Sequence, residues 1–109
     1  VDATRHLLTR GAEVNQPGWT PLMYAASGGH LNVARLLISN GAQVNATAEN
    51  GNTPLMMAAR EGHAAVVSLL LASGADAGLQ TASGATAASI AQERKHPQIL
   101  DLIAKHVQR

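Results

Sequence analysis

Three histidines, His30, His63 and His96, recur at a spacing of 33 residues and are the side chains whose pattern could do chemistry. Imidazole is a common zinc ligand, but zinc ligands must all lie about 2 Å from one ion. A fixed spacing of this length puts the histidines at equivalent positions of stacked helical units, about 8–10 Å apart. We therefore predict that each histidine begins a helix and bonds to backbone, and that there is no metal site.

Other catalytic arrangements are also missing from the sequence. The serines Ser27, Ser39 and Ser68 and the carboxylates form no triad or acid–base pair by their spacing. The chain has no cysteine and no glycine-rich loop that could cradle a phosphate after a strand. The expectation is a protein without catalytic residues or a cofactor, and not an enzyme.

The histidines belong to a longer internal repeat. The segment Thr20–Met23 returns as Thr53–Met56, and glycines mark the same offset at Gly18, Gly51 and Gly84. A period of this length is typical of a stacked repeat rather than of a protein with one central core. Such stacks often present an extended binding surface.

Each unit has recognisable helix boundaries. Thr53 can accept a hydrogen bond from an unpaired N–H group, and Pro54 suits the first helical position. Gly62 ends this first helix, because glycine tolerates the left-handed conformation that follows a last turn. A second helix is predicted over about residues 64–73, followed by a hairpin-shaped connector. Helical spacing predicts these inward residues: Val33, Leu36, Leu37 and Ile38; Val66, Val67, Leu69, Leu70 and Leu71; Ile99, Leu102 and Ile103.

These motifs resemble the ankyrin-repeat family. The family pattern G-x-T-P-L-H-x-A-A-x-x-G-H, followed by V-x-x-L-L and G-A-D-V-N, is closely met from Gly18 and again from Gly51. The resemblance implies an all-α solenoid of antiparallel helix pairs joined by hairpin-like loops. It implies three repeats and an N-terminal half repeat in one domain, 1–109, divided as 1–17, 18–50, 51–83 and 84–109.

Two departures from the family pattern lead to further expectations. The histidine after Thr-Pro-Leu is replaced by Met23, Met56 and Ser89, so the hydrogen bond between threonine and histidine should be missing. The last unit has Lys95 where the others have glycine, and its polar residues suggest a cap that completes the C-terminal end.

At the other end, residues 1–10 align with a second helix whose first helix is absent. Either the chain is a fragment or the protein continues upstream. The short connector between Gly11 and Gly18 is a tolerated deletion or a functional notch, and both remain open.

Composition narrows the classes of partner. The net charge is +1 and the basic residues are scattered, which argues against nucleic-acid binding. No apolar run is long enough to span a bilayer. Apolar residues make up 46% of the chain, and phenylalanine is absent, so the core must be aliphatic. The resemblance favours a cytoplasmic location, although the alanine-rich, cysteine-free composition also fits an exported bacterial protein.

The resemblance places a partner along the concave side, on hairpin tips and first helices. The residues at these positions are Trp19, Ser27, Gly28, Thr47, Glu49, Asn50, Asn52, Arg60, Glu61, Gln80, Ala82, Ser83, Ala85, Glu93 and Arg94. Trp19 could be an exposed interface anchor or could pack on a neighbouring hairpin. Tyr24, Met57 and Ile90 are expected to pack between repeats.

The leading hypothesis is a non-catalytic module that binds a protein or peptide in this groove, with no bound cofactor. The rival is a structural or regulatory segment of a larger polypeptide that docks in cis. A monomer is expected, with self-association through the uncapped N-terminal face as an alternative.

Overall fold

The computed structural model describes residues 19–107, and that range contains six helices and no strand. The helices are α2 (Pro21–Gly28), α3 (Leu31–Ser39), α4 (Pro54–Glu61), α5 (Ala64–Ala72), α6 (Ala87–Glu93) and α7 (Pro97–Val107). The predicted all-α solenoid is confirmed, and the helix pairs fall within 18–50, 51–83 and 84–109. The predicted half repeat, 1–17, lies outside the described residues.

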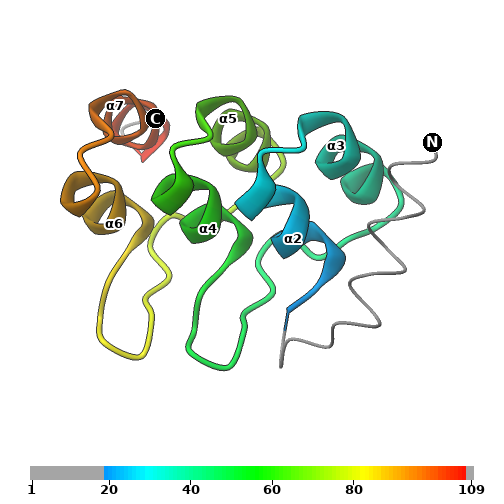
Figure 1. The fold of residues 1–109 in the computed structure, drawn as a ribbon, viewed down its shortest axis with the longest axis horizontal. Coiled ribbons are helices and arrows are strands. Elements are labelled where there is room, and N and C mark those ends of the chain that lie inside the picture. Colours follow the sequence, from blue (N-terminus) through cyan, green and yellow to red (C-terminus); the bar gives the residue numbers. More distant parts are fainter. Residues whose placement is uncertain (1–18, 108–109) are drawn as a thin grey trace.

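The helices form two rows (Figure 1). The first helices stack as α2 on α4 on α6, and the second helices stack as α3 on α5 on α7. Long loops connect each pair to the next and extend from the side of the first helices, so the loops and the first-helix row share one face of the molecule. This is the face on which the resemblance places a partner.

A threonine caps each first helix, as its sequence predicts. The hydroxyls of Thr20, Thr53 and Thr86 accept the backbone N–H three residues later, at 3.3, 3.2 and 3.2 Å. These bonds satisfy N–H groups that have no partner within the helix. At two of the positions where the family has histidine, other acceptors take the reciprocal bond: Met23 Sδ accepts from the Thr20 N–H at 3.3 Å, and Ser89 Oγ accepts from the Thr86 N–H at 2.8 Å.

The repeated histidines link neighbouring repeats. His63 Nε2 donates to the Ser27 carbonyl at 3.0 Å, and His96 Nε2 donates to the Arg60 carbonyl at 3.2 Å. Each ring also lies against the glycine that ends the preceding repeat's first helix, Gly29 or Gly62, both in the left-handed conformation. The predicted hydrogen bond to backbone is confirmed for these two histidines, and the acceptor belongs to the preceding repeat.

The core is aliphatic, and the prediction of its inward-facing residues is wrong at one position. Val33, Val66 and Ile99 are buried, as are Leu37, Leu70 and Ile103 four residues later in each helix. Leu36 was expected inside but is 41% exposed. Its equivalents Leu69 and Leu102 are only partly buried. Residues four apart share a helix face, so the leucine just before the second buried position lies at the edge of that face.

Candidate functional site

A cleft of about 450 Å³ opens between two loops and the helices α4 and α6; we call the loops the second loop (residues 40–53) and the third loop (residues 73–86). Eight of the residues selected from the sequence line it: Asn50, Asn52, Arg60, Ala82, Ser83, Ala85, Glu93 and Arg94. The rest of the lining is Thr81 and Ile90. Folding thus brings together predicted residues from two repeats at one place on the loop-bearing side.

Backbone hydrogen bonds give the cleft its shape. The loops close on themselves through the Ala48 N–H to the Asn52 carbonyl at 2.9 Å and the Thr81 N–H to the Ala85 carbonyl at 2.8 Å. The two loops are joined by the Ala82 N–H, which donates to the Asn50 carbonyl at 3.0 Å. The walls are therefore held by main-chain bonds.

Arg60 is positioned by Asn52. Asn52 is buried, with only 3% of its surface exposed. Its Oδ1 accepts a hydrogen bond from Arg60 Nη2 at 3.0 Å. The Asn52 N–H in turn donates to Asn50 Oδ1 at 3.1 Å. Asn52 was selected as a contact residue, and the structure places it in the cleft lining, largely buried, where it holds the guanidinium.

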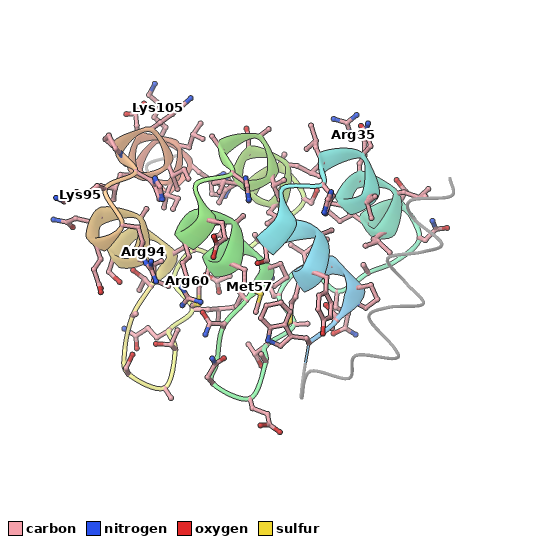
Figure 2. The ribbon with its side chains drawn as sticks, in the orientation of Figure 1. Arg35, Met57, Arg60, Arg94, Lys95 and Lys105 are labelled. Atoms are coloured by element: carbon pink, nitrogen blue, oxygen red, sulfur yellow. The ribbon has the colours of Figure 1, made fainter. Side chains whose placement is uncertain are left out.

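Figure 2 shows Arg60 and Arg94 close together at the ends of α4 and α6, on the side where the loops extend. Arg94 is exposed, and Glu93 beside it also lines the cleft. Within residues 19–107 the single ion pair joins Lys105 Nζ to Asp101 at 3.1 Å. The charges of the cleft therefore have no opposite charge within ion-pair distance in the described part of the chain.

The other predicted contact residues lie outside the lining of this cleft. Thr47 and Glu49 are exposed on the second loop, and Glu61 is exposed at the end of α4. Ser27 is half-buried, and its carbonyl accepts the bond from His63.

Trp19 packs within its own repeat, and its role as an interface anchor stays a prediction. Its ring packs on Tyr24 of the same repeat, with ring centroids 4.9 Å apart and an interplanar angle of 58°. The side chain stays partly exposed. Met57 and Ile90 are buried, as expected for packing between repeats.

A family model of ankyrin repeats, in three copies, matches residues 1–81. The chain belongs to the ankyrin-repeat family. Ankyrin repeats are generally protein–protein interaction modules. The helix pair α6 and α7 continues the same architecture beyond the matched residues.

A curated relative, the human protein phosphatase 1 regulatory subunit 27, is 40% identical over 55 residues. The alignment covers 48% of this chain and 36% of the relative. The chain thus matches about a third of the length of that protein.

Two lining residues escaped the sequence argument about the ankyrin groove. Thr81 shares a hydrogen bond of 2.9 Å with Ser83 and accepts from the Ala85 N–H at 3.1 Å. Its equivalent one repeat earlier is Ala48, so the period gave no signal for a polar residue. Ile90 was assigned only to packing, yet it forms part of the cleft floor.

The remaining features of the described ankyrin repeats concern membranes and metals. None of the helices within residues 19–107 has the length and apolar character needed to cross a membrane. In the same range, no three histidine or acidic side chains come together as a set that could hold a metal ion.

Proposed function

We propose that this chain is a non-catalytic interaction module that binds a protein or peptide segment in the cleft between its loops and the helices α4 and α6. The proposal rests chiefly on the cleft, which gathers eight sequence-selected residues from the second and third loops and from the ends of α4 and α6. Membership of the ankyrin family supports it.

The chemistry of the cleft suits a partner chain better than a buried small molecule. Small-molecule sites are mostly apolar and enclose most of the ligand. Here Ala82, Ser83 and Arg94 are exposed, and seven of the ten lining residues carry an amide, a hydroxyl or a charge. Ala85 and Ile90 offer a small apolar floor, as expected where one side chain of a partner is inserted.

The relative's description as a regulatory subunit fits a role through binding rather than catalysis.

The test is a pair of matched tryptophan substitutions. Ala82→Trp fills the cleft from an exposed position on the third loop, whereas Ala104→Trp places the same side chain on an exposed position of α7 that does not line the cleft. Proteins captured from a lysate of the source organism would be compared by mass spectrometry. A partner of the cleft is lost with Ala82→Trp and retained with Ala104→Trp.

A partner retained equally by both variants would contradict the cleft as the binding site. Docking in cis would be favoured by a different result. In that case no separate partner is captured, and residues of the third loop crosslink to another segment of a longer polypeptide.

A further inference from the structure

Arg60 and Arg94 bring two guanidinium groups to the lining of one cleft. Arg60 reaches it from α4 and Arg94 from the end of α6 (Figure 2). Arg60 is already oriented by its bond to the buried Asn52, so less side-chain freedom would be lost when it binds a ligand. Neither arginine has a carboxylate within ion-pair distance among residues 19–107.

The arginine pair arises from an inversion of charge between the repeats. One period of 33 residues relates Arg60 to Glu93 and Glu61 to Arg94. A regular repeat would line up equal charges, but here the inverted order brings Arg94 into the lining with Arg60 while Glu61 stays outside it. The cleft lining therefore carries two positive charges, Arg60 and Arg94, and one negative charge, Glu93.

We propose that this cleft selects an acidic peptide segment and holds one Asp or Glu carboxylate between Arg60 and Arg94. This inference rests on the proposed function and specifies its partner. The planar guanidinium fork matches a carboxylate in geometry, and charged hydrogen bonds of this kind are stronger than neutral ones. Ala85 and Ile90 provide contact for the carbon atoms of the inserted side chain.

The distribution of charge distinguishes this partner from a nucleic acid. Binding a phosphate backbone requires a row of positive charges. The cleft has two, beside Glu93, in a chain of net charge +1. A single carboxylate on a peptide matches this arrangement.

The experiment uses the full 109-residue chain, immobilised and panned with a random-peptide phage library. Selected peptides are then synthesised with a fluorescent label, and binding is measured by fluorescence anisotropy. We expect enrichment of Asp or Glu at one position. Arg60→Gln and Arg94→Gln should each weaken binding about tenfold or more, the loss expected for a charged hydrogen bond.

Two further variants and one peptide change sharpen the result. Arg35→Gln removes an exposed arginine on α3, outside the cleft, and should leave binding unchanged. Glu93→Gln should bind as tightly as the native chain or several-fold tighter, because it removes a charge that repels the peptide. Replacing the selected acidic residue by Gln or Asn in the peptide must weaken binding to the native chain, a measurement that needs no protein variant to fold.

The outcomes separate this inference from the proposed function. Peptides that lose binding to Ala82→Trp but show no acidic preference, or no loss with Arg60→Gln and Arg94→Gln, would overturn the acidic partner and leave the cleft as a binding site. Selected peptides unaffected by Ala82→Trp would contradict both. A peptide with phosphoserine in place of the acidic residue that binds far more tightly would overturn the carboxylate in favour of a phosphorylated segment.

Discussion

Gly62, at the end of α4, is the residue whose replacement should reveal how the repeats are held together. Its φ is +78°, in the left-handed region, and a Cβ there would lie 2.9 Å from Cε1 of the His96 ring. That ring donates to the Arg60 carbonyl at 3.2 Å. An alanine at position 62 would therefore strain the backbone and also push the histidine from its place between repeats.

The two effects can be separated with Gly74, which ends the second helix of the same repeat. Its φ is +97°, but a Cβ there meets nothing within 4 Å. The left-handed conformation costs an L-residue about 1–2 kcal/mol, and reduced freedom of the unfolded chain offsets about 0.4–1 kcal/mol of this. Gly74→Ala should thus lower the free energy of unfolding by about 1 kcal/mol. Gly62→Ala should also lose a hydrogen bond worth about 1 kcal/mol, for a total of about 2 kcal/mol.

The assay is urea unfolding followed by circular dichroism, with a thermal scan in parallel. For a domain of this size, about 2 kcal/mol corresponds to a fall in Tm of roughly 8 °C. The single variant His96→Ala and the double variant Gly62→Ala/His96→Ala complete a double-mutant cycle. Its coupling energy should be about 1 kcal/mol, because the methyl group added at position 62 no longer meets a ring when His96 is alanine. Equal losses for Gly62→Ala and Gly74→Ala would refute the reasoning, since the contact with the imidazole would then contribute nothing.

Two further variants test features of single residues. Asn45→Ala removes two hydrogen bonds between repeats, one to the Gly74 carbonyl at 3.2 Å and one from the Asp76 N–H at 2.7 Å. Urea unfolding should therefore show a free energy of unfolding lower by about 1–2 kcal/mol. Asn40→Ala is the control, and its loss should be smaller because it removes one bond within its own repeat. Lys95 has a φ of +61°, so Lys95→Gly should be more stable than Lys95→Ala by about 1 kcal/mol in the same assay. Equal stabilities would contradict strain at this position.

Much of the fold was predictable because its signals are local. The Thr53 cap and the stop at Gly62 depend on hydrogen bonds and backbone preferences within a few residues. The period of 33 then repeats these signals and predicts the stacking. The error at Leu36 shows the limit of the pattern: consecutive leucines read alike in sequence, but their directions differ by about 100° around a helix, and one falls at the edge of the buried face.

The candidate site was predictable only as a list of positions. The resemblance identified Asn52, Arg60 and Arg94 as facing a partner, but it could not say that Asn52 would be buried beneath Arg60. Side-chain burial depends on how tightly neighbouring loops approach each other, and here the third loop bonds to the second at Ala82.

The sequence by itself determined the helices, their caps and the direction in which repeats stack, because these follow from interactions between residues near in the chain and from the constant period. Tertiary structure alone decided which charges meet. Arg60 and Arg94 are not equivalent in the period, yet they share one cleft, while Glu61 lies outside its lining. That outcome depends on the packing of α4 against α6 and on the closure of two loops, which no local signal specifies.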